Sequence, residues 1–173
     1  MNLKHVVVSA ALACGASVAL ADSPFTAALS FVGGTVGFSR TPTNGGTLGV
    51  SFVDTYNFTL TGTSFLTFGS ITTSEVPATG MDLDFTSVAL TGPSGPYNYV
   101  FSAAGSAETY RLDPVSLTPG SYSLVMSGLQ EGTAPGSYGG QLNIVPIPEP
   151  ETYTLMLAGA SALGFIFKRR RQR

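Results

Sequence analysis

The stretch SFVDTYNFTL, residues 51–60, alternates between two kinds of side chain along its whole length. Phe52, Tyr56 and Phe58 fall on one face of an extended chain, because successive side chains of a strand point to opposite sides. Asp54 stands in the same apolar row, where an unpaired carboxylate would be costly to bury. We therefore expect a half-buried strand, with Asp54 at a sheet edge or bend or held by backbone N–H groups.

The rest of residues 22–145 has the same character. Short runs rich in β-branched and aromatic residues are separated by Gly, Pro, Asn and Ser, and no segment shows sustained helical periodicity. This pattern predicts an all-β domain, a β-sandwich of jelly-roll type, with a small barrel as the alternative. The expected strands are 28–38, 47–53, 55–61, 65–73, 83–91, 97–103, 107–112, 121–127 and 139–145.

The N-terminus has the three parts of a secretory signal peptide. Lys4 supplies a positive charge, an apolar run follows, and Ala19 and Ala21 form an A-x-A site for signal peptidase. We expect residues 1–21 to be removed by that enzyme.

Cys14 is the one cysteine of the chain and lies inside this segment. Lipid attachment to Cys14 is the alternative, although Ala11 stands where a lipoprotein signal usually has a larger aliphatic residue. Cleavage after Ala21 leaves an exported chain without cysteine, and therefore without disulfides or thiol chemistry.

The segment between the two ends is acidic and poor in catalytic side chains. Residues 22–147 contain two arginines and eight carboxylates, a formal charge of −6, and no His, Cys, Lys or Trp. A Ser–His–Asp or Cys–His arrangement has no base there, and zinc has no His or Cys ligand. The segment also lacks the basic surface that nucleic acid requires. We expect no enzyme activity, no cofactor and no nucleic-acid partner.

Carboxylates are the remaining candidates for a site. Asp82 and Asp84 form a D-x-D pair that could contribute to a calcium site, although two solvated acids at a strand start are the simpler interpretation. With Glu75 or Glu108 the pair could also form a glycosidase dyad. This is the weakest hypothesis, because the chain has no Trp to line a sugar cleft.

The C-terminal segment, VPIPEPETYTLMLAGASALGFIFKRRRQR, combines prolines, an apolar run and cations. The run Tyr153–Phe167 has no charge, which predicts a transmembrane helix. Its fifteen residues span about 22 Å at ~1.5 Å per residue, short of a hydrocarbon core of about 30 Å. Because the cations follow the run, the positive-inside rule leaves the tail end in the cytoplasm and places the domain on the outer side of the membrane. These cations are Lys168, Arg169, Arg170, Arg171 and Arg173.

Pro148-Glu149-Pro150, the short apolar span and the terminal basic block together resemble the PEP-CTERM protein-sorting signal of Gram-negative bacteria. The resemblance implies transient anchoring in the inner membrane and processing by exosortase, a membrane-embedded protease or transpeptidase. It also implies a final place at the cell surface or in a biofilm matrix of extracellular polysaccharide. The expected organisation is a signal peptide (1–21), an exported domain (22–145) and a sorting signal (146–173).

A second resemblance lies in the domain itself. Phe52, Asp54, Tyr56 and Phe58 are similar to the motif of the FxDxF family of PEP-CTERM proteins, with Tyr56 in place of its second Phe. The family offers no catalytic residue to carry over. The expected function is therefore a non-enzymatic surface or matrix protein, and a carbohydrate-binding module acting on extracellular polysaccharide is the alternative.

Overall fold

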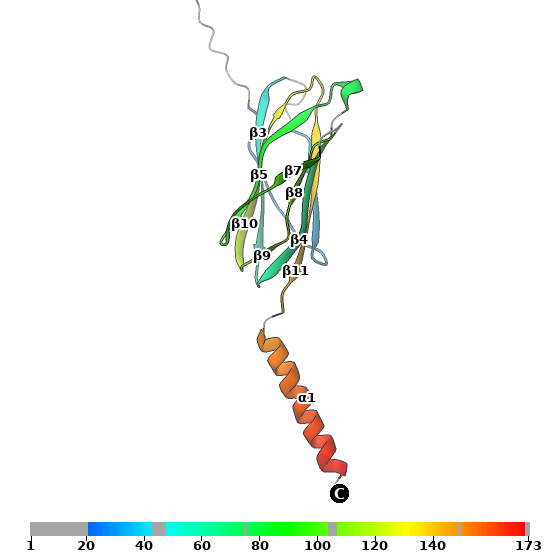
Figure 1. Ribbon diagram of the computed structural model, residues 1–173. Helices are drawn as coiled ribbons and strands as arrows, with labels where there is room; N and C mark the ends of the chain where they lie inside the picture. Colours follow the sequence, from blue (N-terminus) through cyan, green and yellow to red (C-terminus); the bar gives the residue numbers. More distant parts are fainter. Residues whose placement is uncertain (1–20, 43–47, 75, 104–106, 149, 172–173) are drawn as a thin grey trace, which may run out of the picture.

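The strands form two β-sheets that lie face to face, and a single helix leaves one end of them (Figure 1). The computed structural model describes residues 21–42, 48–74, 76–103, 107–148 and 150–171. The predicted all-β class with a C-terminal helix is confirmed, and two separate sheets favour the sandwich over the barrel. The jelly-roll type stays a prediction, and the signal peptide lies outside the described residues except for Ala21.

The first sheet has the strand order β1-β3-β10-β5-β6, and the second has the order β2-β11-β4-β8-β7, with β9 paired to β4. β1 and β3 are parallel, and every other named pair is antiparallel. The strands of the first sheet are β1 (Phe25–Ala28), β3 (Val50–Leu60), β5 (Leu83–Gly92), β6 (Gly95–Asn98) and β10 (Gly120–Gln130). Those of the second are β2 (Thr35–Arg40), β4 (Ser64–Ser74), β7 (Val100–Ala103), β8 (Thr109–Leu112), β9 (Val115–Leu117) and β11 (Ser137–Pro146), with a 3₁₀ turn at Pro77–Thr79.

One hydrophobic core fills the space between the sheets. The alternation predicted for β3 is confirmed, because Phe52, Tyr56 and Phe58 are all buried. The ring of Phe52 stacks on that of Tyr138 from the opposite sheet, with centroids 6.0 Å apart. Further buried side chains come from both layers, among them Leu66, Ile71, Leu83, Leu90, Leu124, Met126, Leu142 and Ile144.

Three predicted strands before residue 62 are wrong in their boundaries. Strands 47–53 and 55–61 are one strand, β3, which passes through Asp54 without a break. Strand 28–38 is interrupted at Gly33 and Gly34, whose φ angles of 61° and 84° belong to a turn. A side chain at Gly34 would also meet the backbone of Ile144, because its Cβ would lie 2.5 Å from the carbonyl oxygen.

The predicted strand 97–103 is in fact two strands that belong to different sheets. β6 pairs with β5 in the first sheet, and β7 pairs with β8 in the second. The chain crosses between the layers at Tyr99, whose buried ring belongs to the core. A period-two pattern cannot reveal this crossing, because the residues remain extended on both sides of it. The short strand β9 was not predicted.

The helix α1 (Pro150–Arg171) has favourable residues at both ends. Proline is well placed at the first helical position, Glu151 lies near the positive N-terminal end of the helix dipole, and the cations lie near its negative C-terminal end. The side chains described for it are exposed. Within the described part of the chain, no helix has both the length and the hydropathy to span a bilayer. The transmembrane assignment of Tyr153–Phe167 stays a prediction.

The core makes a direct prediction about stability. Leu124 is fully buried in β10, so Leu124→Ala should lower the free energy of unfolding by about 2–5 kcal/mol through lost burial and a residual cavity. Val53 is 45% exposed on the outer face of β3, and Val53→Ala should cost less than about 1 kcal/mol. Urea unfolding of both variants measures the difference, and equal losses would contradict the assignment of these two faces.

Candidate functional site

Three charged side chains meet inside the sandwich. Arg40 is the last residue of β2 in the second sheet, Asp54 lies in the middle of β3 in the first sheet, and Asp22 precedes β1. Arg40 Nη2 donates to Asp22 Oδ2 at 2.8 Å, and Nη1 donates to Asp54 Oδ1. Both carboxylates are completely buried and the guanidinium is 10% exposed. We call these three residues the ion cluster; it joins both sheets and the N-terminal segment.

Two tyrosines and one phenylalanine also contact the ion cluster, and the Ser23 N–H donates to Asp22 Oδ1 at 2.8 Å. Tyr138 of β11 donates its hydroxyl hydrogen to Asp54 Oδ2, and the hydroxyl oxygens of Tyr56 and Tyr138 lie 3.3 Å apart. The guanidinium carbon of Arg40 lies 4.5 Å from the ring centre of Phe25, a cation–π contact. Each oxygen of Asp54 thus has a side-chain partner.

The prediction for Asp54 was therefore wrong in its details. β3 lies between β1 and β10, so Asp54 is not at an edge, and its described partners are side chains rather than backbone N–H groups. Arg40, Asp22 and Tyr138 were missed as partners. The composition contained one indication of the Arg40 contact. Arg40 is one of only two cations between residues 22 and 147, so few residues could pair with a buried carboxylate.

The phenols in this site are held in their neutral form. Burial raises the pKa of Tyr138, and its hydrogen bond with Tyr56 raises it further, while Arg40 lowers it. Burial also raises the pKa of Tyr56, more than Tyr138 and Arg40 lower it. Both hydroxyls therefore stay protonated near neutral pH. The four residues of the FxDxF resemblance, Phe52, Asp54, Tyr56 and Phe58, all lie inside the sandwich.

The carboxylates considered for calcium or catalysis do not form a comparable cluster. The backbone carbonyl of Asp82 accepts a hydrogen bond from Gln130 Nε2 at 2.9 Å, and the carboxylate of Glu108 accepts one from the Phe85 N–H at 3.3 Å. Burial raises the pKa of Tyr110, and the negative charges of Glu108 and Asp84 raise it further. No group of three or more metal-binding side chains occurs among the residues that the structure describes. Glu75 lies outside them.

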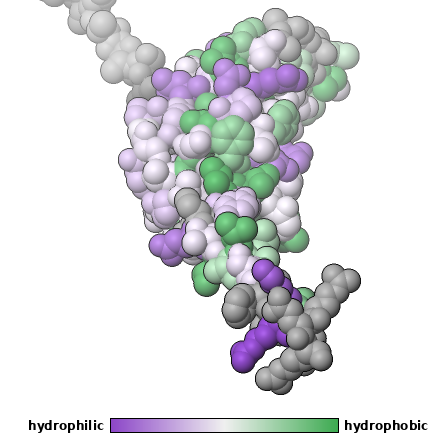
Figure 2. Space-filling model, turned by 60° about the horizontal axis from the view of Figure 1, so that its bottom comes forward, coloured by the Kyte–Doolittle hydropathy of each residue, from purple (hydrophilic) through white to green (hydrophobic). Residues whose placement is uncertain are grey.

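The proline-rich segment is a short exposed connector between β11 and α1. The backbone N–H of Ile147 donates to the carbonyl of Thr63 at 2.9 Å, just after the end of β11. Pro148 is exposed, Glu149 lies outside the described residues, and α1 begins at Pro150. Figure 2 turns this end of the sandwich forward and shows hydrophobic residues on its surface. Those exposed near the end of β11 include Val32, Phe65, Val145 and Ile147.

The residues predicted for signal cleavage and for the basic block lie at the two ends of the chain. Ala21 is exposed and forms a bridge with Ser51 of β3, whereas Ala19 lies outside the described residues. Lys168 and Arg169 are exposed in the last turns of α1. Arg170 and Arg171 belong to the same helix, and Arg173 lies outside the described residues.

A two-layer sandwich with an exposed proline-rich connector and a separate terminal helix defines a β-sandwich protein with a C-terminal sorting tail. Residues 146–171 match the PEP-CTERM protein-sorting motif, so the chain carries the sorting signal of PEP-CTERM proteins. That motif implies an exported, transiently membrane-anchored protein that is processed by exosortase. The narrower FxDxF assignment stays a prediction.

Three solved structures resemble the chain at low TM-scores. The pre-peptidase C-terminal domain of a Bacillus anthracis collagenase is 16% identical, with a TM-score of 0.31 over 71% of this chain and 95% of that chain. The Podospora anserina GH26-CBM35 β-(1,4)-mannanase is 14% identical, with a TM-score of 0.38; the match covers 68% of this chain and 29% of that chain. A mutant of PliG-Ec, a periplasmic inhibitor of g-type lysozyme from Escherichia coli, is 14% identical, with a TM-score of 0.33; the match covers 70% of this chain and 99% of that chain. These likenesses carry no argument about function, and no curated protein matches the chain.

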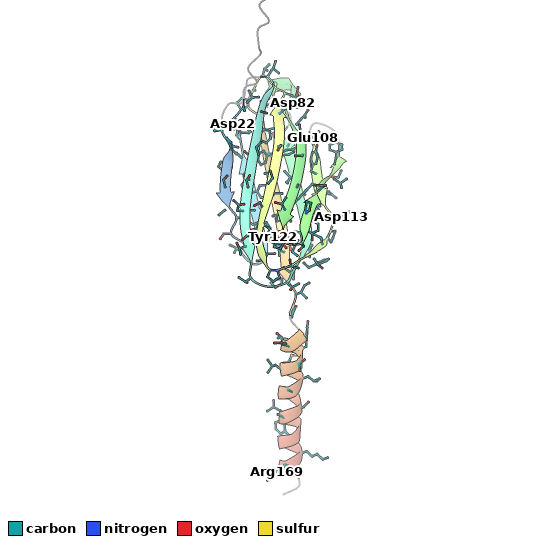
Figure 3. All side chains as sticks on the ribbon, turned by 90° about the vertical axis from the view of Figure 1, so that its left-hand side faces the viewer. Asp22, Asp82, Glu108, Asp113, Tyr122 and Arg169 are labelled. Atoms are coloured by element: carbon teal, nitrogen blue, oxygen red, sulfur yellow. The ribbon has the colours of Figure 1, made fainter. Side chains whose placement is uncertain are left out.

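From the contacts of the ion cluster we expect a nearly isosteric substitution at Asp54 to lower the stability of the fold substantially. Asp54→Asn removes the charge that Arg40 and Tyr138 both contact, and should lower the free energy of unfolding by about 3 kcal/mol. The value lies at the low end for a broken buried ion pair because Asp22 still contacts Arg40. The matched control is Asp113→Asn, an exposed position (Figure 3), which should change stability by less than about 0.5 kcal/mol. Chemical denaturation measures both, and equal small effects would show that the ion cluster contributes little.

Proposed function

We propose that the protein is a non-enzymatic component of the cell surface or biofilm matrix. It is first anchored in the inner membrane by its C-terminal helix, and exosortase then separates it from this helix by cutting at Pro148-Glu149-Pro150. The observation that carries this proposal is the sorting motif at residues 146–171, which begins at the end of β11, includes the exposed Pro148 and continues through α1. Signal peptidase acts on the other end of the chain, after Ala21.

The position of the connector suits proteolysis without unfolding. All the buried core residues of the described chain fall between Val50 and Ile144, before the connector begins. Cleavage at the motif would remove the helix and the basic block and leave both sheets whole. While the tail is anchored, the exposed apolar side chains near the end of β11 would face the membrane.

The described side chains support a structural rather than a catalytic role. Asp54 is engaged by Arg40 and Tyr138, and the neighbouring phenols are neutral. The carbohydrate-binding alternative needs exposed rings on which a sugar can stack. Four tyrosines of the sandwich lie in its core, namely Tyr56, Tyr99, Tyr122 and Tyr138, and the exposed rings include Phe65, Phe68 and Phe101. Retention of the chain on a glycan array would favour the alternative.

The proposal is tested on the mature C-terminus. In a host with exosortase, intact mass spectrometry should find a chain that ends near residues 148–150, and deletion of the exosortase should leave the chain extended to Arg173. The double variant Pro148→Ala/Pro150→Ala should behave like the deletion, because the tripeptide is changed. Glu151→Gln, one residue beyond the motif, should be processed like the unchanged chain. An identical mass with and without exosortase would refute the sorting step.

A further inference from the structure

The turns at the end of the sandwich nearest the helix carry no charge. Leu60 pairs with Gly120 at this end, where β3 ends and β10 begins. Ser64 pairs with Pro146, where β4 begins and β11 ends. The four turns gathered here contain neutral residues alone, and they are residues 32–35, 61–64, 92–95 and 117–120. We call these turns, together with the last residues of β11, the neutral end.

A very short piece of chain ties the neutral end to the start of the sorting helix. The backbone N–H of Ile147 donates to the carbonyl of Thr63 at 2.9 Å, and α1 begins at Pro150. Three peptide steps of ~3.8 Å separate Ile147 from Pro150, a reach of at most about 11 Å. A bilayer that holds the helix would therefore lie within contact range of the neutral end.

The neutral end also exposes apolar side chains beside its uncharged turns. Val32 is 83% exposed, and Phe65, Val145 and Ile147 are exposed at the same end. Phe65 and Val145 are direct partners across β4 and β11, so their side chains lie together on the surface. A groove of about 310 Å³ opens at this end, and its lining includes Phe31, Leu60, Ile144 and Pro146. Exposed apolar patches of this kind mark contact with another molecule or with a membrane.

The carboxylates that the structure describes lie away from the neutral end. Figure 3 shows Asp22, Asp82 and Glu108 at the opposite end of the sandwich. Asp84 and Glu131 are close to Asp82 there, and Asp54 and Asp113 lie partway along the strands. The eleven residues of β3 alone span about 33 Å at ~3.3 Å per residue, whereas salt screens exposed charges within about 8 Å. The acidic character of the domain therefore does not keep the neutral end away from anionic headgroups.

We propose that the neutral end is a lipid-contacting surface that rests on the phospholipid bilayer while the helix is anchored. Its partner is the boundary between headgroups and acyl chains, in which amphipathic surfaces bury their apolar side chains by about 5–10 Å. The contact holds the sandwich upright on the membrane, with its carboxylates away from the lipid. It also keeps Pro148-Glu149-Pro150 at the height of the headgroups, within reach of a membrane-embedded protease. This inference rests on the proposed anchoring by the tail.

Because the chain has no tryptophan, one introduced ring reports on one position. Three variants of the tail-bearing chain each receive a tryptophan at an exposed leucine or valine: Val32→Trp at the neutral end, Leu48→Trp at the opposite end and Leu157→Trp in α1. Each variant is inserted into phosphatidylcholine vesicles whose acyl chains carry bromine, which quenches nearby tryptophan fluorescence. The rings at positions 32 and 157 should lose about half of their fluorescence or more, since both would be buried at least about 5–10 Å into the boundary. The ring at position 48 should keep its fluorescence.

A charge added to the surface tests whether the contact depends on its apolar character. Val145→Asp in the Val32→Trp chain should reduce the quenching at least about twofold, because a carboxylate resists transfer into lipid. Val100→Asp, at an exposed valine of β7, is the matched control and should leave the quenching unchanged. Raising the salt from about 0.1 M to about 0.5 M should also leave it unchanged, since the contact is not ionic.

The three reporters separate failure of this inference from failure of the anchoring stage. Quenching at position 157 without quenching at position 32 would overturn the inference and leave the anchored stage standing. A blue-shifted but unquenched ring at position 32 would indicate a second copy of the chain in place of lipid, and would also overturn it. So would equal quenching at positions 32 and 48, no effect of Val145→Asp, or loss of the quenching at high salt. No quenching at any of the three positions would overturn the inference together with the membrane stage of the proposed function.

Discussion

The contact of Arg40 with Asp54 is the interaction on which the sandwich depends. Without a cation, a carboxylate in the inner row of β3 would face the core unpaired, and the strand would have to end or turn outward there. Arg40 arrives from the opposite sheet and Tyr138 from the strand beside it, so the same charge fixes both layers. Because the carboxylate is satisfied, β3 runs unbroken from Val50 to Leu60 and pairs with β10 along its whole length.

A structural feature of this sandwich could be predicted from the sequence only where the interacting residues lie close together in the chain. The faces of β3 and β10 follow from alternation, because neighbours in a strand are also neighbours in sequence. The partners of Asp54 do not, since Arg40 is 14 residues away and Tyr138 is 84 residues away. The crossing at Tyr99 was missed for a related reason, because sheet membership depends on distant pairing. The gap at Gly33 and Gly34, by contrast, has a local signal, because two adjacent glycines favour a turn.

The sorting tail was easier to predict because its three parts are contiguous and need no tertiary partner. The motif, the apolar run and the basic block are each recognisable in one segment, and the match over residues 146–171 agrees with them. The helix predicted from the uncharged run Tyr153–Phe167 is confirmed as part of α1, because an apolar run with a proline before it and cations after it favours a helix through local interactions alone.

The buried charges also connect the two processing events in physical terms. The C-terminal cut falls beyond the last buried residue, Ile144, so it changes where the protein is held and leaves the core as it was. The predicted N-terminal cut falls just before Asp22, which is 4% exposed, so it would keep the ion cluster within the exported domain. Both cuts would therefore leave the buried interior of the sandwich unchanged.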